Sequence, residues 1–118
     1  LGDVYKRQWR IGEELSDEDG YQAARNALIN ALAQLKEAVG DLDRVVKIVR
    51  LEGNTHSAPG HRGQPQVLNG ASDLLLEVFG DRGRHTRTAL GISEMPLGAA
   101  VQISLWAEVT DGDDSPPA

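Results

Sequence analysis

The chain of 118 residues contains no cysteine and carries more acidic than basic side chains, with a formal net charge of -6. The absence of cysteine excludes disulfide bonds, thiolate nucleophiles and thiolate metal sites. The negative charge disfavours nucleic acid as a partner, because affinity for the phosphate backbone comes largely from lysine and arginine. Any chemistry must come from other side chains, and we expect no nucleic-acid partner.

Long apolar runs are also absent. No segment approaches the length of a membrane span, and the N-terminus lacks the basic and then apolar order of a secretory signal. These absences predict a cytoplasmic protein without a membrane partner. The length suits one domain with one hydrophobic core, and no linker or internal repeat divides it.

The two ends of the chain differ from the rest in composition. Residues 1–8, LGDVYKRQ, are the codon-by-codon translation of the end of a transposase-based sequencing adapter, CTCGGAGATGTGTATAAGAGACAG. We expect them to be an adapter-derived artefact and the authentic domain, truncated at its N-terminus, to span residues 9–109. Residues 110–118 form an acidic, proline-containing tail without apolar anchors, which predicts disorder.

Apolar spacing predicts two amphipathic helices. The first begins after Ser16, an N-cap candidate followed by three acidic residues, and its apolar stripe ends at Gly40. The second begins at Pro65, which suits a first helical turn, and ends at Gly80.

Three strands are predicted around these helices. Residues 45–51 are rich in β-branched side chains and favour a buried strand, followed by a loop dense in glycine and proline. Residues 85–92 and 99–109 favour two further strands, joined in a hairpin by Met-Pro-Leu-Gly. The last strand alternates between apolar and mixed side chains. The order of elements predicts an α+β fold with two helices on one face of a sheet.

The candidate chemistry lies on the last two strands. Gln102, Ser104 and Trp106 share a face that suits neither a helix-covered core nor plain solvent, so we expect a second subunit to cover it. Arg87, at the start of the preceding strand, would lie at that subunit seam and could hold a ligand carboxylate by two parallel hydrogen bonds. The alternative, and the more frequent role of such an arginine, is a structural pair with Asp or Glu.

Histidines and glycine-bracketed segments do not predict a site. His56, His61 and His85 lie in or beside predicted loops without tight ligand spacing, so we expect solvated side chains and no metal. Neither GHRG nor GDRG follows a strand and opens a helix as a phosphate-binding loop does, and both segments predict turns. Nothing selects a Ser-His-Asp triad among the available residues.

Most of the chain resembles the RidA/YjgF family of reactive intermediate deaminases, also called L-PSP endoribonuclease-like. The resemblance rests on GEELSDEDGYQAARNALINALAQLKEAVGDLDRVVKIVRLEG, NTHSAPGHRGQPQVLNGASDLLLEVFG and GRHTRTALGISEMPLGAAVQISLWAEV. It implies a chorismate mutase-like mixed sheet with two helices packed on one face, in a homotrimer with ligand clefts between subunits. The family's N-terminal β-hairpin has no counterpart here, so we expect it to be missing.

The resemblance also implies an activity that needs no cofactor. In the deaminase branch, the arginine corresponding to Arg87 holds the carboxylate of a 2-imino or 2-enamino acid released by pyridoxal phosphate-dependent enzymes, and water yields the 2-keto acid and ammonia. A family glutamate that positions water falls on Gln102, which can orient water but cannot act as a general base. Asn69 and Glu94 are further candidate residues of the substrate cleft.

Three functions follow from these residues. The leading hypothesis is RidA-like hydrolysis of small imino acids, of the 2-iminobutanoate or 2-iminopropanoate type, with Arg87 and Gln102 in catalytic roles. The alternative is a trimeric protein that binds small carboxylates without turnover, because glutamine stands where an acid is expected. Ribonuclease activity ranks last, since the chain is acidic and offers no clear acid-base pair on a basic surface.

Overall fold

A computed structural model of the chain describes residues 10–95 and 99–111. The expected adapter residues 1–8, most of the expected tail and most of the Met-Pro-Leu-Gly turn lie outside the described residues. Thr110, the first residue of the expected tail, is hydrogen-bonded to Arg44. None of the helices in the described part has the length and apolar character needed to cross a bilayer.

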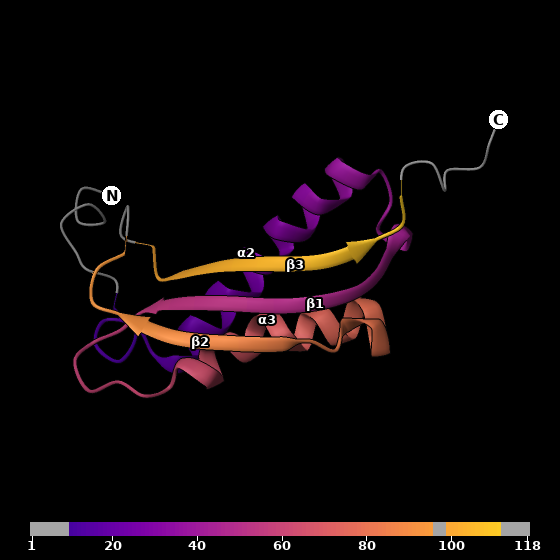
Figure 1. Cartoon of the computed structure of the whole chain (residues 1–118). Helices are drawn as coiled ribbons and strands as arrows, with labels where there is room; N and C mark the ends of the chain where they lie inside the picture. Colours follow the sequence, from indigo (N-terminus) through magenta and orange to yellow (C-terminus); the bar gives the residue numbers. More distant parts are fainter. Residues whose placement is uncertain (1–9, 96–98, 112–118) are drawn as a thin grey trace.

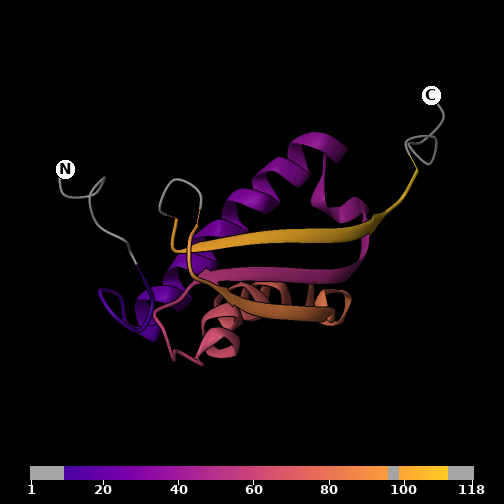
Figure 2. The same ribbon diagram turned by 60° about the vertical axis from the view of Figure 1, so that its left-hand side comes forward.

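Two helices lie on one face of a three-stranded sheet (Figure 1). In chain order the elements are α2 (Asp17–Val39), η1 (Leu42–Arg44), β1 (Val45–His56), α3 (Gln64–Phe79), η2 (Gly80–Gly83), β2 (Thr86–Ile92) and β3 (Val101–Val109). Figure 2 shows both helices on the same side of the sheet. The predicted α+β architecture is confirmed.

Local signals set the helix ends. The Ser16 side chain accepts a hydrogen bond from the backbone N–H of Asp19, and the Asp19 carboxylate accepts one from the backbone N–H of Ser16. This reciprocal cap satisfies two donors at the start of α2 and lowers the pKa of Asp19. α2 ends at Val39, and the C-cap Gly40 has a φ of 91°, which favours glycine. Both predicted helices agree with the structure to within one residue.

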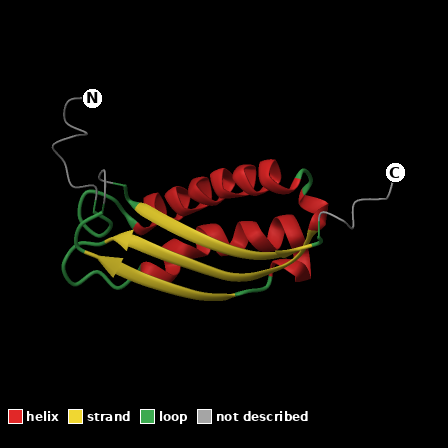
Figure 3. Ribbon diagram, turned by 45° about the horizontal axis from the view of Figure 1, so that its top comes forward, coloured by secondary structure: helices red, strands yellow, loops and turns green. Residues whose placement is uncertain are grey.

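The central strand of the sheet is β1. It pairs in parallel with β2 and antiparallel with β3, which gives the order β2-β1-β3 (Figure 3). The predicted hairpin between β2 and β3 is therefore wrong, because β1 lies between them. The chain between β1 and β2 passes through α3, as a parallel connection requires, and β3 pairs with the other edge of β1.

β1 is longer than the sequence pattern predicts. Residues 52–56 were expected in a loop, but residues 52–55 pair with both neighbouring strands and His56 pairs with β2. Gly53 lies so close to α3 that a Cβ atom there would meet the side chain of Leu68, and Thr55 and His56 are buried. The loop prediction failed because the glycine serves close packing beneath a helix rather than a turn. β2 and β3 begin one and two residues later than predicted.

The hydrophobic core lies between the helices and the sheet. Leu28 of α2, Leu51 of β1 and Leu68 of α3 are fully buried in it. β3 alternates as predicted, since Val101 is buried while Gln102 and its even-numbered neighbours are exposed on the face without helices. The sheet therefore has one covered and one uncovered face.

α2 and α3 approach each other closely at Gly70. A Cβ atom on Gly70 would meet the backbone carbonyl oxygen of Tyr21 on α2. Beside this contact the Tyr21 hydroxyl donates to the Asp73 carboxylate at 2.8 Å, and this hydrogen bond raises the pKa of Tyr21. Arg25 pairs with Glu77 at 3.0 Å across the same two helices. The absence of a side chain at Gly70 permits this helix separation.

Replacing Gly70 by alanine should lower the free energy of unfolding, although alanine is the better helix former by about 1 kcal/mol. The added methyl must push the backbone of α2 away, and overpacking of this kind costs about 1–3 kcal/mol. Chemical denaturation measures the change, with Gln66→Ala at an exposed position of the same helix as the control. A Gly70→Ala protein at least as stable as the parent would contradict this account.

Candidate functional site

Arg87 lies near the start of the edge strand β2 and points toward α3. The register pairs it with Leu51, which is buried beneath the helices. Its Nη1 donates to Oδ1 of Asn69 at 2.7 Å and, more weakly, to Oγ of Ser72 at 3.3 Å. The side chain is half-buried. Two residues one turn apart on α3 thus hold the guanidinium.

No carboxylate pairs with Arg87 among residues 10–95 and 99–111. The ion pairs in this part of the chain all involve other cations. The acceptors of Arg87, an amide oxygen and a hydroxyl, are neutral, so they leave its charge uncompensated. A structural ion pair therefore does not explain this arginine within one described chain. The arrangement suits an anion that binds from outside.

Ser72 connects Arg87 to His85. Nε2 of His85 lies 2.9 Å from Oγ of Ser72, and Nδ1 lies 2.6 Å from the carbonyl oxygen of Gly83. A carbonyl oxygen only accepts, so Nδ1 carries the hydrogen, and Nε2 of the neutral ring accepts from the Ser72 hydroxyl. The hydrogen bonds run without a break from Gly83 to Arg87.

The sequence analysis did not identify Ser72 and His85 as site residues, although their spacing from Asn69 and Arg87 indicates them. His85 and Arg87 are two residues apart, a spacing that places both side chains on one side of an extended chain. Asn69 and Ser72 are three residues apart, a spacing that places both on one face of a helix. What the sequence did not reveal is that these two faces meet.

The expectation of solvated histidines is wrong for all three. His56 lies in β1 with 1% exposure and donates from Nε2 to the carbonyl oxygen of Ser93 at 3.0 Å. Nε2 of His61 lies 2.6 Å from the carboxylate of Asp17 at the start of α2. Each ring is fixed by tertiary contacts that loop composition does not reveal. Across the described residues, no three histidine, aspartate or glutamate side chains gather as a metal site would require.

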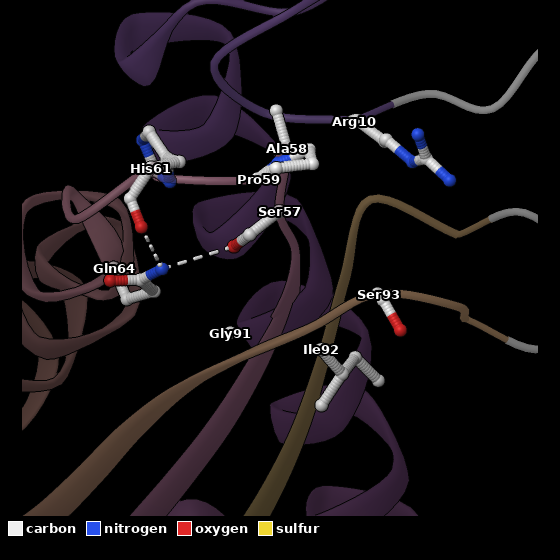
Figure 4. A pocket seen from close by; sticks show the side chains of 9 residues that line it. All are labelled: Arg10, Ser57, Ala58, Pro59, His61, Gln64, Gly91, Ile92 and Ser93. Atoms are coloured by element: carbon white, nitrogen blue, oxygen red, sulfur yellow. Dashed lines mark hydrogen bonds between the residues drawn. The ribbon is translucent and has the colours of Figure 1, made fainter.

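A pocket of about 390 Å³ opens where β1 and β2 end (Figure 4). The side-chain amide of Gln64 donates to Oγ of Ser57 at 3.1 Å and to the carbonyl oxygen of His61 at 2.8 Å. The segment GHRG borders this pocket, follows β1 and leads directly into α3 with Gly63 as N-cap, contrary to the prediction that it does not connect a strand to a helix. Sequence reasoning missed the pocket because its walls come from three separate segments.

The structure does not bring Gln102 or Glu94 to Arg87 within one chain. Gln102 pairs with Asn54 of β1, and both lie on the uncovered face of the sheet, opposite to Arg87. Ordinary strand spacing separates the Cα atoms of Gln102 and Arg87 by about 14 Å. Glu94 follows β2 and is exposed. Of the candidate cleft residues, only Asn69 contacts Arg87.

Comparison with known proteins gives a family match over nearly the whole chain. The model of a family described as "YjgF/chorismate mutase-like, putative endoribonuclease" matches residues 2–109. Protein TCP17 of Trypanosoma cruzi is 41% identical over 103 residues, which cover 86% of this chain and 64% of that protein. The chain therefore spans a little under two thirds of this relative's length.

Two crystal structures share the fold. Protein Atu1372 of Agrobacterium tumefaciens, of unknown function, superposes with a TM-score of 0.86 at 34% identity, over 89% of this chain and 68% of that one. A "putative endoribonuclease" of Shewanella oneidensis superposes with a TM-score of 0.84 at 43% identity, over 86% and 68% of the two chains. The chorismate mutase-like arrangement expected from the sequence is confirmed.

Proposed function

The chain belongs to the RidA/YjgF family, and we propose that it hydrolyses reactive 2-imino or 2-enamino acids to 2-keto acids and ammonia. The observation that carries the proposal is the half-buried guanidinium of Arg87, held by Asn69 and Ser72 without a carboxylate partner in the described residues. The carboxylate of such a substrate supplies the counter-charge. Once it is fixed, the imine carbon is held in place for attack by water.

The proposed reaction adds water to the imine carbon and expels ammonia. The water oxygen bonds to that carbon, its protons pass to the nitrogen, and the carbon–nitrogen bond breaks to leave the ketone. Gln102 can orient the water through its side-chain amide but cannot accept a proton. Because Gln102 lies on the opposite face of the sheet from Arg87, the Gln102 that meets the ligand belongs to another subunit.

The proposal includes a homotrimer with ligand clefts between subunits. Exposed apolar side chains lie on the uncovered face of the sheet, and these are Val46, Val49, Leu90 and Trp106. Exposed apolar side chains on a sheet face without helices are typical of protein interfaces. Because Arg87 lies on the edge strand β2 but faces α3, a second copy would bring its own Gln102 to Arg87 only by extending past the β2 edge as well as covering this face.

A second candidate function is binding of small carboxylates without turnover. The groups that contact Arg87 are an amide and a hydroxyl, and Gln102 stands where the family's deaminases have an acid. These groups can bind an anion, but neither an amide nor a hydroxyl acts as a general base near neutral pH. Ribonuclease activity, which the family description and the Shewanella protein's name suggest, is disfavoured by the net charge of -6.

Arg87→Ala should lower the rate of 2-keto acid formation from an enzymatically generated 2-imino acid by at least about thirtyfold, because losing a charged bidentate contact costs about 2–4 kcal/mol. The control is Arg84→Ala, which removes the same charge from a side chain that is 79% exposed.

Gln102→Glu separates the two candidate functions in the same assay. Acceleration by the parent chain supports the hydrolase, whereas activity in Gln102→Glu alone supports the carboxylate-binding protein. An Arg87→Ala variant that hydrolyses the imine as fast as the parent would remove the proposal.

Trp106→Glu should shift the assembly toward monomers, because it replaces an exposed apolar side chain of the uncovered face with a charge that is costly to bury against another copy. Light scattering coupled to size exclusion measures the mass. Ile29→Glu is the matched control, since Ile29 on the solvent side of α2 is 49% exposed and Trp106 is 46% exposed. An unchanged mass in Trp106→Glu would show that this face is not the interface.

A further inference from the structure

The protein engages only one nitrogen of the Arg87 guanidinium. Both hydrogen bonds, to Oδ1 of Asn69 and to Oγ of Ser72, leave from Nη1, whose two hydrogens are then fully used. Within the described part of the chain, nothing accepts from Nε or Nη2. One edge of the planar group, with three N–H donors, is therefore left for a ligand.

The orientation of the Ser72 hydroxyl decides whether it can hold Arg87. To accept from Nη1, the hydroxyl must direct its own hydrogen elsewhere, and Nε2 of His85 lies 2.9 Å away to take it. His85 is itself fixed, because its Nδ1 hydrogen goes to the carbonyl oxygen of Gly83 at 2.6 Å. The hydroxyl hydrogen of Ser72 is thus directed at His85. The lone pairs of Ser72 Oγ are left to accept from the Arg87 guanidinium.

We propose that Ser72 and His85 are positioning residues that lock the Arg87 guanidinium so that its Nε and Nη2 edge faces the ligand. The inference rests on the proposed function, because it takes a carboxylate as the ligand of Arg87. A carboxylate needs two parallel hydrogen bonds from a fixed edge, whereas a spherical ion such as bromide responds to charge alone. Without Ser72, only Asn69 restrains Nη1, and the planar group can turn away from that geometry.

The test compares the binding of 2-oxobutyrate and of bromide to the full chain by NMR titration. Ser72→Ala should bind 2-oxobutyrate about tenfold more weakly, the loss of one hydrogen bond to a charged group, with bromide affinity kept within about twofold. His85→Ala should also weaken the binding of 2-oxobutyrate relative to that of bromide, by a smaller factor than Ser72→Ala. Ser72→Thr keeps the hydroxyl and should restore binding. Arg84→Ala, next to His85 in sequence but paired with Asp81, should match the parent.

Failure of this inference differs from failure of the proposed function. A parent chain that does not bind 2-oxobutyrate, or an Arg87→Lys variant that binds it equally well, overturns the proposed function and this inference together. If the parent binds and Arg87→Lys weakens binding, but Ser72→Ala and His85→Ala bind like the parent, only the positioning role is wrong.

A substitution can also weaken binding by disturbing the fold, and the bromide affinity detects this. Equal losses for bromide and 2-oxobutyrate in Ser72→Ala overturn the positioning role, because general damage rather than orientation then accounts for the effect. Should Ser72→Ala fail to fold, His85→Ala and Ser72→Thr still decide the matter by the ratio of the two affinities.

Discussion

The pairing of β1 with a strand on each side is the constraint on which the rest of the structure depends. Side chains alternate along a strand, so the register with β1 decides the face on which every side chain of β2 and β3 lies. That register places Arg87 beside Leu51 under the helices and Gln102 beside Asn54 on the uncovered face. One chain therefore cannot apply both side chains to the same small ligand. This placement supports the proposed site shared between copies.

Features set by neighbouring residues could be predicted from the sequence. The cap at Ser16 and the glycine at position 40 act over one helical turn, so a pattern of a few residues contains all the information that fixes them. The alternation along β3 is also local, because it needs only a strand with one buried face. Arg87 was identified by the same kind of pattern, as a charged group opening an apolar strand.

Features set by distant residues could not be predicted from single-sequence patterns. Adjacent strands in sequence favour a hairpin, but β1 offers two edges, and α3 delivers β2 to one of them. Residues 52–56 have the composition of a loop and become a strand only because partners exist on both sides. The same holds for His85, whose acceptor and donor partners come from η2 and α3. Composition describes a segment, whereas these outcomes depend on what packs against it.

The neutral groups around Arg87 explain how an acidic chain can retain a cationic site. An aspartate in place of Asn69 would offer an oxygen at a similar position, but it would also cancel the guanidinium charge and compete with any anionic ligand. Asparagine and serine hold the same nitrogen by geometry alone and leave the charge available. The net charge of -6 repels anions at long range, but salt screens that repulsion beyond about 8 Å at physiological ionic strength. In the proposed function the fixed guanidinium acts within that distance, where arginine presents two aligned donors and lysine presents a single mobile charge.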